Sequence, residues 1–185
     1  MGLETKFAKG DPPRLTEGVR LDGYASFFGE VDSGGDIVAP GAFAAGLRAA
    51  RSEGRSVKML WQHDPSRVIG VWDDVREDDR GLRVSGRLLP EVAAGREAAA
   101  LVEAGALDGL SIGYSVKRAT RDDAGRRVLR DVELWEVSLV TFPMLATARV
   151  GAKAQTMGAV VRALHALRGE IAGHDASAHD GGRHD

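Results

Sequence analysis

The sequence contains no cysteine. Disulfide frameworks, zinc–thiolate sites, iron–sulfur clusters and cysteine nucleophiles are therefore excluded. Long apolar runs are also missing: none approaches the roughly 18 residues that a membrane-spanning helix needs. The polar segment 1–20 lacks the apolar core of a signal peptide. We therefore expect a soluble protein of the cytoplasm that has no membrane partner.

An excess of basic charge is missing as well. The chain carries 25 Lys and Arg against 27 Asp and Glu, which gives a net charge of -2, and its pI is about 6.2. Proteins that bind nucleic acid neutralise phosphates with a basic surface, so we expect no direct nucleic-acid partner. The 185 residues, 43% of them hydrophobic, suffice for one domain with a substantial core.

The pattern along the chain divides it into three parts. Residues 1–18 are interpreted as a flexible arm, because Pro12–Pro13 oppose regular structure. Residues 19–150 hold the alternating and periodic segments of a folded domain. Residues 151–185 are predicted to form a C-terminal helix at 158–169 and then a disordered tail. Both terminal segments are expected to leave their backbone exposed and flexible.

Short strands dominate the middle part. Apolar and polar residues alternate most clearly in Leu82–Leu88, after a hairpin turn at Asp78–Gly81. The alanine-rich segment Pro90–Gly105 predicts a helix with Gly105 as its C-terminal cap. Further strands are expected at 19–27, 57–62, 67–75, 111–117 and 126–141, and a short helix after Pro40. The pattern indicates a mainly β, α+β fold: an antiparallel, closed or nearly closed sheet with a few helices.

His63 ends the apolar segment Val57–Gln62, at a point where a turn begins. A histidine in such a position can face a cleft, and imidazole titrates near neutral pH, which suits it to act as a general base. It is also the one histidine before residue 165. Taken alone, the segment fits a structural histidine bonded to a backbone carbonyl at least as well.

Ser111 lies in Gly109–Gly113, which has the pattern G-x-S-x-G. Small neighbours leave its hydroxyl open to a substrate, and nearby backbone N–H groups can stabilise an oxyanion. A serine at a strand edge, flanked by turn glycines, is the plain alternative. The pattern also marks the nucleophile elbow of α/β-hydrolases, which requires a helix after the serine and a later histidine. Here a strand is predicted after Ser111, and His63 precedes it, so the elbow is disfavoured.

Glu136 lies within Val132–Val140, a strand whose two faces are both largely apolar. A buried carboxylate needs a partner, because an isolated buried charge is costly. Orienting a catalytic histidine would satisfy it; an ion pair with an arginine such as Arg118 is the alternative. Glu133 is the main competitor for the role of catalytic acid, and Asp131 is a weaker one.

The C-terminal tail carries a His-Asp pair three times, the last at His184–Asp185. Imidazole and carboxylate both bind metals. The spacing of the pairs does not align them on one helix face, and the surrounding Gly and Ala offer no rigid scaffold. We therefore expect a solvated tail, no metal site and no cofactor.

Four segments follow one another in a distinctive order: Asp36–Phe43, Leu60–Asp64, Gly105–Tyr114 and Leu134–Pro143. Together they resemble the prohead maturation proteases of tailed phages, over about residues 19–150. The order of all four makes the resemblance specific, whereas one segment alone would not. The alanine- and arginine-rich composition would also suit the related protease of a gene transfer agent.

The resemblance implies a fold like that of herpesvirus assemblin, an antiparallel β-barrel surrounded by a few helices. It implies a serine endopeptidase with His63 as the base and Ser111 as the nucleophile. The third member of the triad should follow the serine, and Glu136 is chosen over Glu133. Assemblin-like enzymes use a second histidine there, and none stands in Glu133–Ser138, so the triad would be of the Ser-His-acid type. The oxyanion donors are expected among backbone N–H groups near Ser111 and Ile112, with Arg149 as a side-chain candidate.

By the same resemblance, the substrates are the major capsid protein and any internal scaffold protein, and the protease also cleaves itself. Residues 1–18 and 151–185 are the candidate segments for self-processing, because a protease can enter exposed, flexible backbone. Such an enzyme works inside the procapsid, in the cytoplasm of the bacterial host, where high local concentration offsets weak affinity for a peptide. It could act as a homo-oligomer. The alternative function is a non-catalytic scaffold or assembly protein that retained the protease fold. Such a protein is expected to have lost His63 or Ser111, and both are present.

Overall fold

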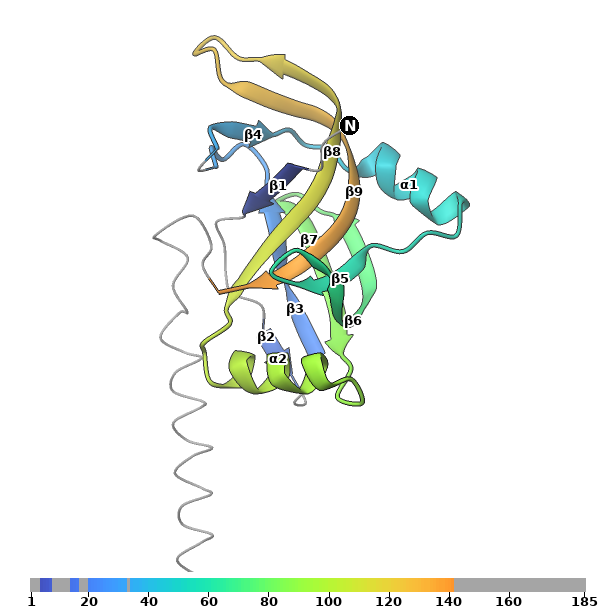
Figure 1. Ribbon diagram of the computed structural model, residues 1–185. Coiled ribbons are helices and arrows are strands. Elements are labelled where there is room, and N and C mark those ends of the chain that lie inside the picture. The colour runs from blue at the N-terminus through green and yellow to red at the C-terminus, as the bar shows by residue number, and fades with distance from the viewer. Residues whose placement is uncertain (1–3, 8–13, 17–19, 33, 142–185) are drawn as a thin grey trace, which may run out of the picture. The chain divides into compact units, whose positions relative to one another are not determined.

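The computed structural model describes residues 4–7, 14–16, 20–32 and 34–141 (Figure 1). Its elements, all within the unit Met1–Val150, are β1 (Glu4–Phe7), β2 (Arg14–Thr16), β3 (Arg20–Phe27), β4 (Asp36–Val38), α1 (Ala44–Ser52), β5 (Lys58–Trp61), β6 (Asp64–Glu77), β7 (Gly81–Leu88), α2 (Ala93–Glu103), β8 (Gly109–Arg121) and β9 (Arg127–Val140). The helix expected at 158–169 and the tail lie outside the described residues.

The described strands form one nine-stranded sheet in the order β1-β8-β9-β5-β6-β7-β3-β2, and β4 pairs with β9. Most pairs are antiparallel, while β4 and β5 run parallel to β9. The long hairpin of β8 and β9 curves across the other strands (Figure 1). The two end strands, β1 and β2, do not pair with each other, so the sheet is a curled half-barrel. The predicted mainly β fold with two helices is confirmed.

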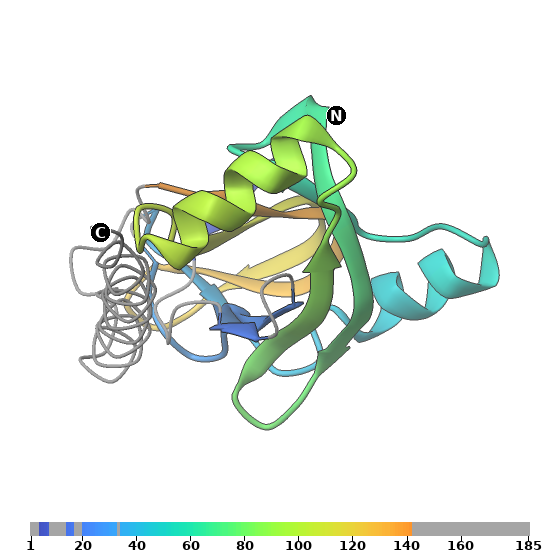
Figure 2. The ribbon, with the colours of Figure 1, turned by 90° about the horizontal axis from the view of Figure 1, so that it is seen from below.

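The two helices flank the sheet. α2 lies across one end of it, next to β6 and β7, whereas α1 packs against β9 (Figure 2). α2 ends in a Schellman motif: Gly105 has φ +72°, and its N–H donates to the carbonyl of Val102 at 3.0 Å. The N–H of Ala106 donates to the carbonyl of Leu101 at 2.8 Å. Gly105 is therefore the predicted cap, and it turns the chain toward β8.

The core is formed by the buried faces of the long strands and the buried side of α1. Its largest fully buried side chains include Phe43, Met59, Ile69, Ile112 and Leu129. β8 is buried along its first half and exposed along its second, and the last part of β9 is buried beside that first half. Four polar residues lie in this buried zone, Ser111, Ser115, Glu136 and Ser138, and buried polar groups of this kind need hydrogen-bond partners.

Two short strands form within the segment that the sequence indicated to be an irregular arm. β1 pairs with β8 and β2 pairs with β3, both antiparallel. The expectation for residues 1–18 was wrong at these two places, because pairing to the edge of an existing sheet outweighs weak local preference. Pro12–Pro13 fall between the two strands. The division into arm, domain and tail otherwise stays a prediction.

Candidate active site

His63 sits in the two-residue turn that joins β5 to β6. Gln62 and His63 have φ +55° and +61°, and Trp61 and Asp64 pair on either side of them. Positive φ at both central residues is the signature of a type I′ hairpin turn, where Asn and Gly are preferred. For other residues the left-handed region costs about 1 kcal/mol or more each. The surroundings must therefore hold this turn in place.

Hydrogen bonds to β9 and the residue after it hold the turn in this conformation. The backbone N–H of Gln62 donates to the carbonyl of Leu139 at 2.9 Å, and its side-chain amide donates to Thr141 Oγ1 at 2.5 Å. The backbone N–H of His63 donates to Ser138 Oγ at 3.1 Å. These bonds offset the strain of the turn and fix the direction in which the imidazole leaves the backbone.

Ser111 lies near the start of β8, directly opposite Ser138 of β9, and is fully buried. β8 continues as a strand to Arg121, so no helix follows the serine. The strand–serine–helix geometry of an α/β-hydrolase elbow is therefore excluded, as the sequence predicted.

Glu136 lies on β9, with 5% of its side chain exposed. Its partner in the β8–β9 ladder is Gly113. A Cβ atom added at Gly113 would lie 2.2 Å from Glu136 Oε1, so the carboxylate occupies the space that any side chain at that position would need. The second glycine of the G-x-S-x-G pattern thus makes room for the acid.

The side chains of Ser111, His63 and Glu136 form a continuous line of hydrogen bonds. His63 Nε2 lies 2.7 Å from Ser111 Oγ, and His63 Nδ1 lies 2.6 Å from Glu136 Oε1. A carboxylate can only accept, so Nδ1 carries the proton and Nε2 accepts from the serine hydroxyl. A hydroxyl in this contact can pass its proton to the imidazole as the oxygen attacks a carbonyl carbon. The structure thus brings three of the predicted residues together.

Ser138 is a further polar residue of this cluster that sequence reasoning missed. It is fully buried; its hydroxyl donates to Glu136 Oε2 at 2.6 Å and accepts from the backbone N–H of His63. Between Glu136 and Ser138 in the strand, the carbonyl of Val137 accepts a hydrogen bond from Trp72 Nε1 at 3.2 Å. The available signal was the spacing Glu-x-Ser, since residues two apart in a strand share a face.

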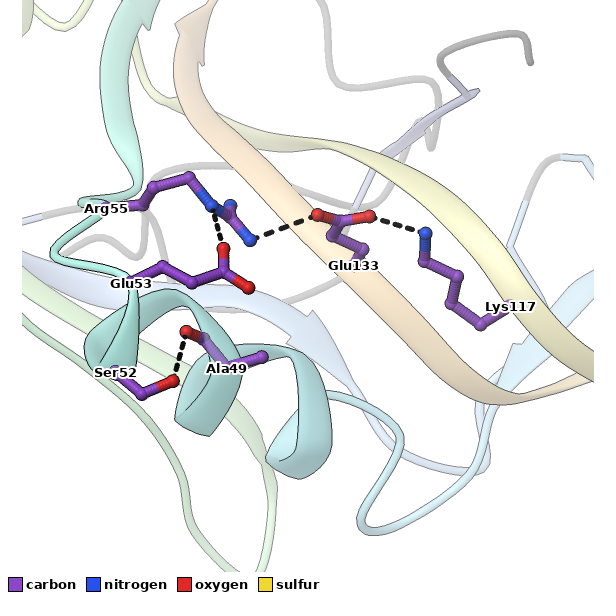
Figure 3. A network of polar contacts seen from close by, with 6 residues as sticks. All are labelled: Ala49, Ser52, Glu53, Arg55, Lys117 and Glu133. Atoms are coloured by element: carbon purple, nitrogen blue, oxygen red, sulfur yellow. Dashed lines mark hydrogen bonds and ion pairs between the residues drawn. The ribbon is translucent and has the colours of Figure 1, made fainter.

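Glu133, the alternative acid, lies in a separate network of charges (Figure 3). Its carboxylate oxygens lie 3.1 Å from Arg55 Nη2 and 2.6 Å from Lys117 Nζ. The hydrogen bond from Lys117 lowers the pKa of the Glu133 carboxyl, and the charge of Arg55 adds to the effect. Asp131, the weaker competitor, lies opposite Arg118 in the β8–β9 ladder. The structure therefore brings neither acid to the imidazole.

Glu133→Gln is expected to lower the free energy of unfolding by about 1 kcal/mol at neutral pH, because it removes the charge shared by Arg55 and Lys117. The pKa of Glu133 is lower in the folded state. Its contribution is therefore present above the unfolded pKa and is lost as pH falls through the folded pKa. Denaturant melts of both proteins from neutral to acid pH measure the difference, which should shrink in acid. A difference that does not change with pH contradicts this account.

The remaining expectations concern donors, metals and membranes. Ile112 lies between Val137 of β9 and Lys6 of β1 in the two ladders, while Arg149 and the His-Asp pairs of the tail lie outside the described residues. In the described part of the chain, no group of three or more His, Asp and Glu is placed to hold a metal ion. No helix of that part is long and apolar enough to cross a membrane.

A curled β-sheet that carries a line of serine, histidine and glutamate has the arrangement of a serine hydrolase site. The chain belongs to the caudovirus prohead serine protease family, whose family model matches residues 8–162. A curated relative, the prohead protease of Enterobacteria phage HK97, is 35% identical over 138 residues. That match covers 71% of this chain and 59% of the relative, so the chain spans about three fifths of the HK97 protein.

A solved structure supports the same fold. The bacteriophage T4 capsid assembly protease matches with a TM-score of 0.61 and 16% sequence identity. The match covers 75% of this chain and 96% of the T4 protein. The half-barrel described above therefore has the same fold as the T4 protein.

Proposed function

We propose that this protein is a serine endopeptidase in which Ser111 is the nucleophile, His63 the general base and Glu136 the acid that orients the imidazole. The observation that carries the proposal is the line of hydrogen bonds at 2.7 Å and 2.6 Å that joins the three side chains. Membership of a family of serine proteases supports it independently.

The proposed reaction uses the chain's own side chains and no cofactor or metal. His63 Nε2 takes the hydroxyl proton while Ser111 Oγ attacks the peptide carbonyl, and the same proton then passes to the leaving amine. The acyl group stays on Ser111 until water, deprotonated by His63, hydrolyses the ester. Glu136 stabilises the imidazolium in both halves of the cycle. The oxyanion donors are proposed among the backbone N–H groups near Ser111 and Ile112, with Arg149 as the side-chain candidate.

The proposed substrates are the precursor of the major capsid protein, an internal scaffold protein where one exists, and the protease itself. Relatives named as a prohead protease and a capsid assembly protease support this choice. We place the activity inside the procapsid, in the cytoplasm of the bacterial host, where confinement raises the concentration of substrate around a weakly binding site. Self-cleavage and assembly into a homo-oligomer are part of the same proposal.

Co-expression with the capsid protein proposed as its substrate tests the proposed function. The capsid precursor is expected to be shortened by the wild-type chain and to keep its full length with Ser111→Ala. Mass spectrometry of the shortened product defines the processed junction. Unshortened precursor with both versions, in particles that still assemble, would support a non-catalytic scaffold protein instead.

Gly113→Ala is expected to lower kcat/KM by about 100-fold, because the new methyl group displaces Glu136 and a shift of about 1 Å in a catalytic group has effects of that size. Cleavage of a junction peptide and a thermal melt, measured on the same protein, separate lost activity from lost folding. Gly34→Ala is the matched control, since the nearest atom to a Cβ there is 3.4 Å away. Full activity in Gly113→Ala contradicts the assigned position of Glu136.

Ser138→Ala is expected to lower kcat about tenfold and the stability by roughly 1–3 kcal/mol, because it leaves a carboxylate oxygen of Glu136 and the N–H of His63 without this partner. Ser138→Thr keeps the hydroxyl and should recover most of kcat. Steady-state kinetics with a junction peptide measure both variants. Equal kcat in the alanine and threonine variants means that the hydroxyl does not position the triad.

A further inference from the structure

The proposed nucleophile is closed off in this structure. Ser111 is fully buried, although 19% of the His63 side chain is exposed. A peptide carbonyl has to reach Ser111 Oγ before any reaction can start. Part of the protein that borders Ser111 must therefore move when a substrate binds.

Both edges of β8 are occupied at this point. Along one edge Ser111 pairs with Ser138 of β9. Along the other edge β1 lies beside β8 (Figure 1). It runs antiparallel to Ser111–Tyr114, and the last residue of β1, Phe7, pairs with Ser111. The chain's own strand thus borders the backbone of the proposed nucleophile over four residue pairs.

The two neighbours of β8 differ in what they contribute. β9 carries Glu136 and Ser138 and cannot leave without dismantling the triad. β1 contributes none of the residues of the triad, and it is only four residues long. A short strand at the end of a sheet is among the parts of a fold that open at low cost in free energy.

We propose that β1 occupies the peptide-binding edge of β8, so that an extended substrate binds by displacing Glu4–Phe7 and pairing with Ser111–Tyr114 in its place. Proteins commonly bind extended peptides by adding them as a strand to a sheet edge. The exchange replaces one set of backbone hydrogen bonds with a similar set. This inference rests on the proposed function, and it makes the N-terminal strand an intramolecular competitor of the substrate.

Such competition has a measurable signature. When only a fraction of the molecules has the edge free, the apparent affinity for the peptide falls by that fraction. The chemistry that follows binding is unchanged, since β1 is absent from the productive complex in every case. Weakening β1 should therefore lower KM and leave kcat as it was.

Thr5→Pro tests this, because proline removes a backbone donor and is poorly accepted within a paired strand. Thr5 stands opposite Gly113 of β8. Thr16→Pro is the matched control: the same substitution in β2, which pairs with β3. With a fluorogenic peptide that spans the processed capsid junction, KM is expected to fall about tenfold for Thr5→Pro, with kcat unchanged, and to stay at the wild-type value for Thr16→Pro.

A synthetic peptide with the sequence of residues 2–7 completes the experiment. Added to Thr5→Pro, it should inhibit competitively and raise KM back toward the wild-type value. An unchanged KM in Thr5→Pro overturns the inference while Ser111-dependent cleavage by the wild type leaves the proposed function intact. Loss of cleavage in Thr5→Pro, whether or not the peptide restores it, means that β1 builds the site and also overturns the inference. If no version shows Ser111-dependent cleavage, the proposed function itself is wrong.

Discussion

Replacement of Ser111 by alanine is expected to lower kcat/KM by about 10³-fold or more, because the oxygen that forms the acyl-enzyme is removed. The protein should remain folded, since the substitution deletes one buried hydroxyl and leaves the packing of β8 in place. Hydrolysis of the junction peptide, followed by product mass, measures the loss. A thermal melt that matches the wild type confirms that the loss is chemical.

His63→Ala should lower kcat/KM by about as much, because it removes the imidazole nitrogen that lies 2.7 Å from the hydroxyl and takes its proton in the proposed reaction. The double variant is the sharper test. When two residues act in the same step, removing either one already abolishes that step, and removing the second costs little more. The double variant Ser111→Ala/His63→Ala should therefore be about as inactive as either single variant. Losses that multiply in the double variant contradict a mechanism in which the two residues share one proton transfer.

The sequence predicted β3 and the strands from β5 to β9, the turn between β6 and β7, and the place of His63, because local patterns determine them. Alternation indicates a strand, and a histidine at the end of an apolar strand marks a turn. The left-handed conformation of this turn could not be predicted from the sequence. Gln62 and His63 are not residues that favour a type I′ turn, and the bonds that hold them come from β9, at Leu139 and Ser138.

The choice between Glu133 and Glu136 depended on a feature that a sequence does not reveal. The β8–β9 ladder pairs Gly113 with Glu136 but the next residue, Tyr114, with Leu134, so Trp135 is an extra residue in a bulge. A bulge changes which face the following residues present. Trp135 is accordingly 42% exposed. No local pattern predicts where such a shift falls, so the sequence could favour Glu136 but could not separate it from Glu133 by the face of the strand.

In residues 1–18, two strands were not predicted from the sequence. Residues 1–18 contain no long alternating run, and a purely local interpretation leaves them irregular. β1 and β2 form because β8 and β3 each present a free edge at the right place. An edge is a property of the assembled sheet, so the strands that bind to it are the last elements that a sequence can predict.

Glu136→Gln is expected to lower kcat by about 10²- to 10⁴-fold, while Glu133→Gln stays within a few-fold of the wild type. A neutral amide at 136 no longer stabilises the imidazolium, and through its N–H it can favour the wrong tautomer of His63. Glu133 is 3.1 Å from Arg55 and 2.6 Å from Lys117, so its loss affects stability and not proton transfer. Steady-state kinetics on the junction peptide, with melts for both proteins, measure the contrast.

Asp in place of Glu gives each position its own internal control. Glu136→Asp keeps the charge but shortens the reach to His63 Nδ1, now 2.6 Å, so activity should fall between that of the wild type and that of Glu136→Gln. Glu133→Asp should be close to the wild type in activity, because its network lies apart from the imidazole. If Glu133→Gln is the inactive variant and Glu136→Gln keeps most activity, the two acids exchange roles. The bulge at Trp135 would then have to be absent from the working enzyme.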